Sequence, residues 1–515
     1  MRIAEFAESD GIALARALRE GAVTRSEVIQ AARGACEALN PSLNAILEFY
    51  FDALEVAGTR EPAADAGMAG FAPSPLAGVP ILRKDVGATE AGRLQECGSR
   101  LLVGHRAARD STYVELCERA GLIFVGRSAT PEFAFSSATE SVLNGVTRNP
   151  WNLERMAGGS SGGAAAAVAA GIVPIAHASD GGGSIRIPAA ASGRVGHKPS
   201  RGRVSQGPDG ADALLGLGAE FVVTRSIRDA AAALDILSQP QPGDPFRLWS
   251  PDRSYAQLAA APPARLRIAV TADRWGDEAV DGEIAIAVAQ AAHLCEQLGH
   301  QVTWASPRFD FEAALRVLTN CFAFGLAGLS AAADAWTVPP DFTLLEPVTF
   351  ANWELSRRLT AVDIHADLST ANSLRRDVGT FFAEYDVLVT PALANPPPGH
   401  GLYSQSRTDL DPLGFMRQCQ HTDQFLPIFN ITGQPALSIP LAVSSLDLPI
   451  GLQLVGRSAH EHVVLALGQQ LMEAAPVRRR PAVWAGKRAS TMAIIARDTE
   501  GVTEVKNHLH IKKDD

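Results

Sequence analysis

The segment that decides the fold reads Ala157-Gly158-Gly159-Ser160-Ser161-Gly162-Gly163, continues through the Ala-rich run 164–170, and ends in Ser179-Asp180-Gly181-Gly182-Gly183-Ser184-Ile185-Arg186-Ile187-Pro188. Glycine reaches positive φ without steric cost and lets a backbone approach a ligand closely. Successive glycine N–H groups can also converge on one point and bind developing negative charge. A serine directly after three glycines is suited to acyl transfer, although a structural turn or a phosphate-binding loop would use the same glycines.

A serine nucleophile needs a base, and no His or Asp suited to a triad stands near these loops in the sequence, which leaves lysine. Lys84 ends the apolar run Gly78-Val79-Pro80-Ile81-Leu82-Arg83. We expect this run to be a strand that enters the core. Burial would desolvate the lysine, lower its pKa and free a lone pair. For this segment alone, a surface lysine paired with Asp85 stays open as the alternative.

Several motifs, in this order along the chain, resemble the amidase-signature family. They are Gly78-Val79-Pro80 with Lys84-Asp85, Thr147-Arg148-Asn149-Pro150-Trp151-Asn152, the two glycine-rich loops, Gly196-His197-Lys198-Pro199, and Gly433-Gln434-Pro435-Ala436-Leu437. The similarity spans about residues 5–475. It implies an α/β fold with a large mixed β-sheet covered by helices on both faces.

The resemblance also implies a catalytic role for three side chains. Lys84 would be the base, Ser160 the bridging serine on a cis peptide, and Ser184 the nucleophile that attacks an amide carbonyl. The oxyanion hole would be formed by the backbone N–H groups of Gly181, Gly182, Gly183 and Ser184. Two positions depart from the family's usual wording, because Gly181 stands where Thr is common and His197 where Leu is frequent.

Within the family, the chain is similar to bacterial 6-aminohexanoate cyclic-dimer hydrolases. This likeness rests on less specific stretches, such as Ala176-His177-Ala178-Ser179-Asp180 and Ser254-Tyr255-Ala256-Gln257. It implies that Phe135 and Cys321 line the acyl pocket, although both would serve equally well as ordinary core residues. The expected substrate is a small or cyclic amide, with carbamates and esters left open.

Outside the motifs, the pattern alternates strands and helices. Capping boxes at Thr24-Arg25-Ser26-Glu27 and Ser226-Ile227-Arg228-Asp229 predict two helix starts, the first helix ending near Asn40-Pro41. Residues 266–304 predict a strand, a helix and a second strand, and further strands are predicted at 386–390, 435–440 and 449–455. We expect one domain over 1–489 and a C-terminal appendage at 490–515, whose role the sequence does not indicate.

Composition narrows the function classes. The net charge of −10 is spread along the chain, and the only basic run, Arg478-Arg479-Arg480, is typical of a solvated surface, so a nucleic-acid partner is not expected. No signal peptide is recognised, and no apolar run such as 164–170 approaches the roughly 20 residues of a membrane span. We expect a cytoplasmic enzyme without a membrane partner; a homodimer stays open.

Neither the cysteines nor the histidines form a metal motif. The six cysteines contain no C-x-x-C pair, and His460-Glu461-His462 has a spacing expected to put its imidazoles on different helix faces. We therefore expect no metal and no cofactor.

Two other functions share some of these features. Gly158-Gly159-Ser160-Ser161-Gly162 matches the nucleophile elbow of α/β-hydrolase esterases, but that elbow needs a buried strand before it, and 149–155 is expected to be a polar loop. The second alternative keeps the fold but makes the chain the glutamine-hydrolysing subunit of a tRNA-dependent amidotransferase.

Overall fold

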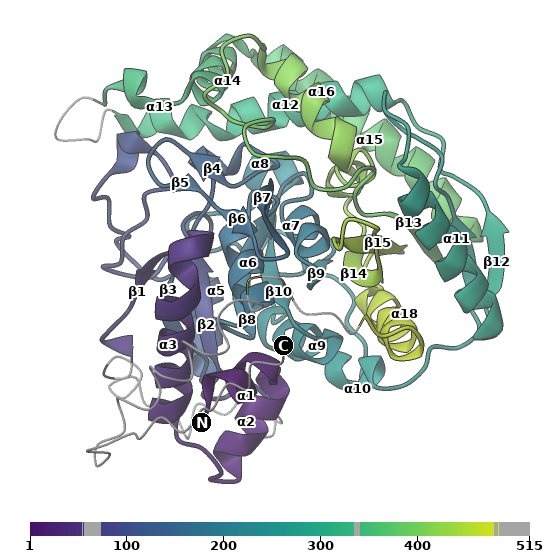
Figure 1. Cartoon of the computed structure of the whole chain (residues 1–515). Helices are drawn as coiled ribbons and strands as arrows, with labels where there is room; N and C mark the ends of the chain where they lie inside the picture. Colours follow the sequence, from purple (N-terminus) through teal and green to yellow (C-terminus); the bar gives the residue numbers. More distant parts are fainter. Residues whose placement is uncertain (54, 56–73, 334–339, 478–480, 482, 484–515) are drawn as a thin grey trace, which may run out of the picture.

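The structure is a computed structural model that describes residues 1–53, 55, 74–333, 340–477, 481 and 483 (Figure 1). The predicted appendage 490–515 and the basic run 478–480 lie outside the described residues. The described residues are arranged around one large β-sheet.

The main sheet has eleven strands in the order β1-β3-β2-β8-β10-β9-β14-β15-β13-β11-β12. It is mixed, because β2 runs parallel to β3 and β8 whereas β10 runs antiparallel to β8. The strands are β1 Ile46–Phe49, β2 Pro80–Lys84, β3 Ile123–Ser128, β8 Ile175–Asp180, β9 Val195–Lys198, β10 Ala219–Thr224, β11 Arg267–Val270, β12 Gln301–Trp304, β13 Val387–Pro391, β14 Ala436–Val443 and β15 Pro449–Gly456.

Helices pack on both faces of this sheet. On one face lie α3 Arg25–Leu43, α6 Gly162–Ala170 and α7 Arg186–Ala191; on the other lie α5 Thr112–Arg119, α9 Ile227–Leu237, α11 Gly282–Gln297 and α18 Glu461–Ala474. The remaining helices are α1 Ile3–Glu8, α2 Gly11–Arg19, α8 Ala213–Gly216, α10 Tyr255–Ala259, α12 Phe311–Gly325, α13 Ala327–Ala333, α14 Pro347–Arg358, α15 Ala361–Glu384, α16 Pro412–Asp423 and α17 Ile428–Thr432. The expected α/β architecture is therefore confirmed.

The expected β-α-β unit is present as β11, α11 and β12, with the two strands parallel. The first helix start is also confirmed, since the Thr24 side chain accepts from the backbone N–H of Glu27 in a full capping box. That helix runs to Leu43, slightly beyond its predicted end, and Asn44 closes it in the left-handed region.

The second capping box is only half formed. Ser226 caps α9 by accepting from the backbone N–H of Asp229, as predicted. The carboxylate of Asp229 instead accepts from the backbone N–H groups of Gly11 and Ile12, at 2.8 and 2.9 Å. A local motif was expected here, but the carboxylate binds the start of α2, more than 200 residues away in the sequence.

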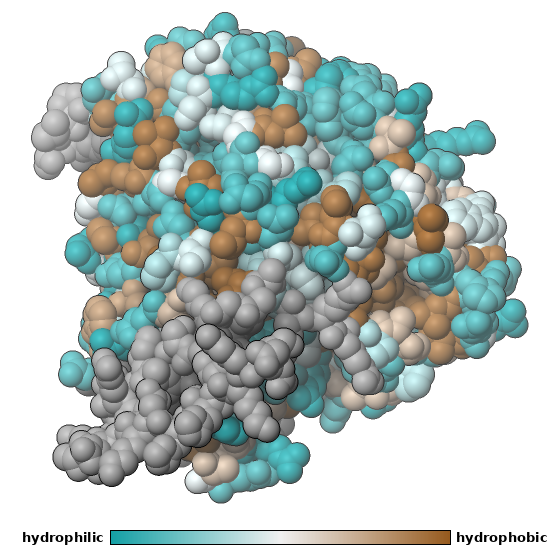
Figure 2. Space-filling model, viewed as in Figure 1, coloured by the Kyte–Doolittle hydropathy of each residue, from teal (hydrophilic) through white to brown (hydrophobic). Residues whose placement is uncertain are grey.

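Several helices form a layer beside the sheet, along the top of Figure 1. In this layer α12 contacts α14, α15 and α16. The expectation that no apolar stretch approaches the length of a membrane span is wrong, because Phe311–Ser330, which covers α12 and part of α13, is long and apolar enough by composition to cross a membrane. More than half of that stretch is buried inside the protein, however, as in the core helix of a globular domain. In Figure 2 hydrophilic residues cover most of this layer, with apolar residues in smaller groups between them.

Small residues in α6 allow this helix to pack closely against its neighbours. Every residue of this helix is buried. A Cβ added at Gly163 would lie 2.4 Å from the backbone nitrogen of Ala129 and 2.5 Å from the carbonyl oxygen of Ala45. The helix can therefore approach the β1 and β3 segments only because Gly163 has no side chain.

We predict that Gly163→Ala destabilises the protein by about 1–3 kcal/mol, because the added methyl group meets backbone atoms that cannot rotate away. A helical Gly→Ala change is otherwise stabilising by up to about 1 kcal/mol. Gly379→Ala in α15, where a Cβ would meet nothing within 4 Å, is the matched control and should be neutral or stabilising. Urea unfolding of both variants measures the difference; equal stability would contradict the packing argument.

Candidate active site

Lys84 ends β2, which lies between β3 and β8 in the main sheet, and its side chain is fully buried. Its Nζ lies 2.8 Å from Ser160 Oγ and 2.9 Å from Ser179 Oγ. Burial lowers the pKa of Lys84 to about 7, although the nearby carboxylates of Glu220 and Asp180 oppose this shift. A substantial fraction of the amine is thus neutral near neutral pH.

The alternative of a surface ion pair between Lys84 and Asp85 is wrong. Asp85 is also buried, and its carboxylate accepts from the guanidinium of Arg127 at 2.7 Å. It also accepts from the backbone N–H groups of Glu96 and Gly98, both at 3.0 Å. Asp85 is therefore saturated by other partners and leaves Lys84 to the two serines.

Ser160 lies in the turn just before α6 and is fully buried. The Gly159-Ser160 peptide bond is cis, as the family resemblance implies. The glycines of this turn are needed for close approach, because a Cβ at Gly158 would lie 2.5 Å from Pro188 Cα and one at Gly159 would lie 2.7 Å from the backbone of Ala138. The turn can therefore carry Ser160 deep enough to reach Lys84.

Ser184 stands in the loop between β8 and α7, and it is 8% exposed. Its carbonyl oxygen accepts from the backbone N–H of Ser161 at 3.3 Å, which joins the two glycine-rich loops. Ser184 lines a cavity whose described lining includes neither Lys84 nor Ser160, and both of these side chains are fully buried. This order, from cavity to interior, fits a nucleophile served by a buried base.

Asp180 and Arg186 fix the shape of the Ser184 loop. The carboxylate of Asp180 accepts from the backbone N–H groups of Gly183 at 2.6 Å and Ile185 at 3.2 Å, and from two nitrogens of the Arg186 guanidinium at 2.9 and 3.0 Å. Arg186 holds the pKa of Asp180 well below its usual range. The loop is therefore tied down from inside, through a carboxylate that stays ionised.

This arrangement bears on the predicted oxyanion hole. The Gly183 N–H points to Asp180, so it is already used inside the loop. The N–H groups of Gly181, Gly182 and Ser184 are not used in this way. They stay predicted oxyanion donors, while Gly183, at φ 133°, serves the turn itself.

The cavity beside Ser184 has a volume of about 30 Å³. Its apolar walls include Phe135, Ile187, Leu318 and Phe322, and the rings of Phe135 and Phe322 meet edge to face with centroids 5.1 Å apart. Phe135 thus lies where the sequence predicted it. Cys321 does not line this cavity; it is buried in α12, where desolvation raises the pKa of its thiol to about 12.

Asp423, at the end of α16, is a cavity residue that no sequence motif indicated. One of its oxygens accepts from Ser137 Oγ at 2.5 Å, and the other, Oδ1, has no partner among the described residues. Burial raises the pKa of Asp423 to about 7. The cavity therefore combines an apolar wall with a carboxylate.

A strand precedes the Ser160 turn, where a polar loop was expected. β6 Arg148–Asn149 and β7 Asn152–Met156 form a separate two-stranded sheet. β7 is mostly exposed or half-buried and is not part of the main sheet. The correction does not favour a nucleophile elbow, because that turn follows a buried strand of the central sheet.

The expectation for His460 and His462 is also wrong. His460 is the residue just before α18, with non-helical backbone, so the helical spacing rule does not apply to it. The two imidazoles lie side by side with centroids 5.6 Å apart and contact the ring of Trp249. Even so, the described residues contain no cluster of three or more His, Cys, Asp or Glu suited to a metal ion.

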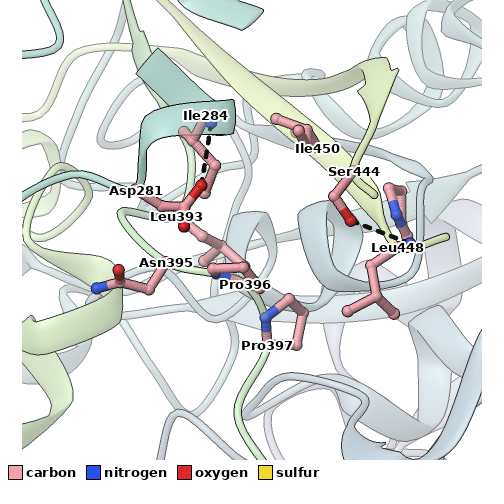
Figure 3. Close-up of a pocket in the computed structure, with 11 residues that line it drawn as sticks. Asp281, Ile284, Leu393, Asn395, Pro396, Pro397, Ser444, Leu448 and Ile450 are labelled. Atoms are coloured by element: carbon pink, nitrogen blue, oxygen red, sulfur yellow. Dashed lines mark hydrogen bonds between the residues drawn. The ribbon is translucent and has the colours of Figure 1, made fainter. Parts of the chain in front are cut away.

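A second hollow lies between the start of α11 and the β14–β15 hairpin (Figure 3). Its volume is about 10 Å³, and none of the predicted catalytic residues lines it. Its one carboxylate, Asp281, caps α11, and Ser444 Oγ accepts from the backbone N–H of Leu448. We interpret this hollow as part of the scaffold.

Comparison with known proteins identifies the family to which the chain belongs. A family model described as Amidase matches residues 27–465. The 6-aminohexanoate-cyclic-dimer hydrolase of Paenarthrobacter ureafaciens is 35% identical over 491 residues, which cover 92% of this chain and 96% of that protein.

Solved structures extend the comparison to the fold. The structure of 6-aminohexanoate cyclic dimer hydrolase aligns with a TM-score of 0.83 and 32% identity, over 92% of this chain and 99% of that one. A bacterial aryl acylamidase of the amidase signature family aligns with a TM-score of 0.80 and 26% identity, over 93% and 98% of the two chains. The chain therefore belongs to the amidase signature family and is an enzyme that hydrolyses amide bonds.

Proposed function

We propose that the enzyme cleaves a small or cyclic amide through an acyl-enzyme, with Ser184 as nucleophile, Ser160 as proton relay and Lys84 as base. The observation that carries this proposal is the contact of Lys84 Nζ with Ser160 Oγ at 2.8 Å in a fully buried environment. A lysine surrounded by serine hydroxyls, rather than carboxylates, can be neutral and accept a proton.

In the proposed acylation step, neutral Lys84 takes the proton of Ser160, Ser160 takes the proton of Ser184, and Ser184 Oγ attacks the amide carbon. The backbone N–H groups of the Ser184 loop stabilise the negative oxygen that forms. The relay then runs backwards and protonates the leaving nitrogen as the C–N bond breaks. In the second step Lys84 again acts as the base, and a water molecule attacks the ester of the acyl-enzyme. This attack releases the free acid and regenerates Ser184.

The relatives and the cavity both support the proposed substrate class. The compared proteins include a hydrolase of the cyclic dimer of 6-aminohexanoate and an aryl acylamidase, both of which act on amides. The apolar wall at Phe135 and Phe322 suits hydrocarbon parts of an acyl group, and the unpartnered oxygen of Asp423 suits an N–H donor. Carbamates and esters with the same acyl group would pass through the same acyl-enzyme.

The proposed enzyme works in the cytoplasm, without a metal, a cofactor, nucleic acid or a membrane, and as a single kind of subunit, with a homodimer left open. The amidotransferase alternative needs a partner subunit to receive ammonia. Hydrolysis of simple amides by the isolated chain, at a rate unaffected by glutamine, would count against that alternative.

Replacing Lys84 tests the base. We expect Lys84→Ala to lower the acylation rate by about 10²- to 10⁴-fold, because the relay loses its proton acceptor. Lys84→Arg should be no better, since a guanidinium stays charged. Circular dichroism checks that both variants are folded. Near-wild-type acylation in Lys84→Arg would contradict the relay.

The pH dependence tests the same group in the unmodified enzyme. Burial depresses the pKa of Lys84 to about 7. Only the neutral amine accepts a proton, so acylation should be slow below that pH, rise through it and level off on the alkaline side. Single-turnover rates with an amide substrate give the profile. A rate that falls as pH rises through neutrality would exclude a lysine base.

Covalent labelling distinguishes the two serines. A fluorophosphonate should modify Ser184, which lines the cavity, and leave Ser160 unmodified because it is enclosed. Ser184→Ala should abolish labelling, and peptide mass spectrometry locates the modified residue. Modification of Ser160 in the wild-type enzyme would exchange the proposed roles.

Removal of metal ions tests the proposal that hydrolysis needs no metal. Dialysis against a chelator should leave the hydrolysis rate unchanged, because the proposed relay needs no Lewis acid. Elemental analysis of the dialysed protein verifies that metal has been removed. Loss of activity that added metal restores would overturn the metal-free mechanism.

A further inference from the structure

The backbone of Lys84 is hydrogen-bonded to a histidine that has no part in the proposed relay. His177, on β8, is fully buried, and its Nδ1 accepts from the backbone N–H of Lys84 at 3.1 Å. A neutral imidazole that accepts at Nδ1 carries its proton at Nε2. Nε2 lies 2.5 Å from a carboxylate oxygen of Glu220, so it donates to that oxygen. Burial lowers the pKa of His177, which agrees with a neutral ring.

Glu220 is placed by the sheet and fixed by its neighbours. It lies on β10 opposite Ser179, the β8 residue whose hydroxyl contacts Lys84 Nζ. A Cβ at Gly87 would lie 2.5 Å from the Glu220 carboxylate, so the glycine, at φ 91°, leaves room for it. The ring of Tyr113 covers His177 with centroids 4.6 Å apart, and its hydroxyl donates to the carbonyl of Phe221 at 3.0 Å.

The other charged groups around Lys84 are less able to act on it. Asp180, at the end of β8, is held in its ion pair with Arg186. On β2 itself, Arg83 carries a like charge and Asp85 is paired with Arg127. In the loop after β2, burial raises the pKa of the Cys97 thiol, which keeps it neutral. Among these carboxylates, Glu220 is the one bonded to a neutral partner, His177, rather than to a guanidinium.

Glu220 also differs from Lys84 in its access to solvent. Its side chain is 15% exposed and lines a cavity of about 180 Å³, which shares no lining residue with the cavity at Ser184. Asp209 lines the same cavity but pairs with the exposed side chain of Arg109. The cavity therefore offers two carboxylates, of which only one is connected to Lys84.

We infer that His177 and Glu220 are positioning residues for Lys84: the imidazole fixes the backbone at the end of β2, and the Glu220 carboxylate keeps a negative charge beside the buried amine. This inference rests on the proposed role of Lys84 as base. Burial alone would make the amine too weak a base to take a proton from a serine hydroxyl. A nearby carboxylate raises the pKa of the amine and so restores part of its basicity. Because Glu220 is bonded to His177 and not to Lys84, it does not replace the contact between Lys84 and Ser160.

The pH profile of acylation in Glu220→Gln tests the charge. Glutamine can still accept from His177 Nε2, so the geometry is kept while the charge is lost. Without the charge the ammonium form of Lys84 is less favoured, its pKa falls, and the rising limb of the profile moves to lower pH by about one unit. The plateau rate should fall less than about tenfold, as expected for a weaker base, with KM unchanged. Asp209→Asn is the matched control and should leave the profile in place.

A second variant tests the backbone contact. In His177→Asn the side-chain oxygen can still accept from the Lys84 N–H, but the link to Glu220 is broken. We expect this variant to keep most of its activity, and Glu220→Gln to shift the profile in its background as well, because the charge acts through space. Thermal unfolding of each variant shows whether the fold is intact.

The outcomes separate this inference from the proposed function. If Lys84→Ala is inactive but Glu220→Gln lowers the rate equally at every pH, Glu220 has only a structural role and the inference is overturned. If Asp209→Asn shifts the profile as much as Glu220→Gln does, the effect is one of general surface charge, and the inference again fails. If Lys84→Arg keeps its activity, the proposed base itself is wrong, whatever Glu220 does.

Discussion

The buried ion pair between Asp180 and Arg186 is the interaction on which the site depends. Both side chains are fully buried, so each charge requires the other. Asp180 holds the Ser184 loop through two backbone N–H groups, and Arg186 reaches the carbonyl of Leu426 and the side chains of Gln453 and Asn430. One ion pair thus joins the glycine-rich loop to β15 and α17, more than 200 residues further along the chain.

The same principle explains how a lysine can lie in the core. A charged amine without a partner would be costly there, and the usual solution is an ion pair with a carboxylate. At Lys84 the nearest partners are the hydroxyls of Ser160 and Ser179, while Asp85 is occupied by Arg127. The fold therefore keeps carboxylates close enough to influence the amine but not in contact with it. The proposed role of Lys84 as a base that cycles between two protonation states requires this arrangement.

Local patterns predicted much of this arrangement. The apolar run that ends at Lys84 indicated a buried strand, and the spacing from Leu266 to Trp304 indicated a β-α-β unit, because both depend on neighbours in sequence. The motifs also indicated Ser160 and Ser184, which the structure places in two joined loops. What the sequence could not indicate was the register of β10 against β8, and that register alone brings Glu220 beside Ser179 and His177.

The predictions that were wrong also failed because of contacts between segments that are distant in the sequence. Asp229 was expected to complete a local capping box, yet its carboxylate binds the start of α2. His460 was expected to follow helical spacing, yet the helix begins one residue later and Trp249 brings the two imidazoles together. Asp423 carries no motif at all, and only the packing of α16 against α12 places it in the Ser184 cavity. In each case a contact between distant segments decided the outcome.

The proposed catalytic residues and the walls of the cavity come from different parts of the chain, and this difference bears on substrate specificity. Lys84, Ser160 and Ser184 all come from the first 190 residues and belong to β2, the turn before α6 and the loop between β8 and α7. The Ser184 cavity, in contrast, takes Leu318 and Phe322 from α12 and Met416 and Asp423 from α16. A change in those helices would alter the shape and polarity of this cavity, while the proposed relay, which Asp180 and His177 hold to the sheet, would keep its geometry. In the proposed mechanism, the sheet thus positions the reacting groups, and the helical layer shapes the part of the cavity that would select the substrate.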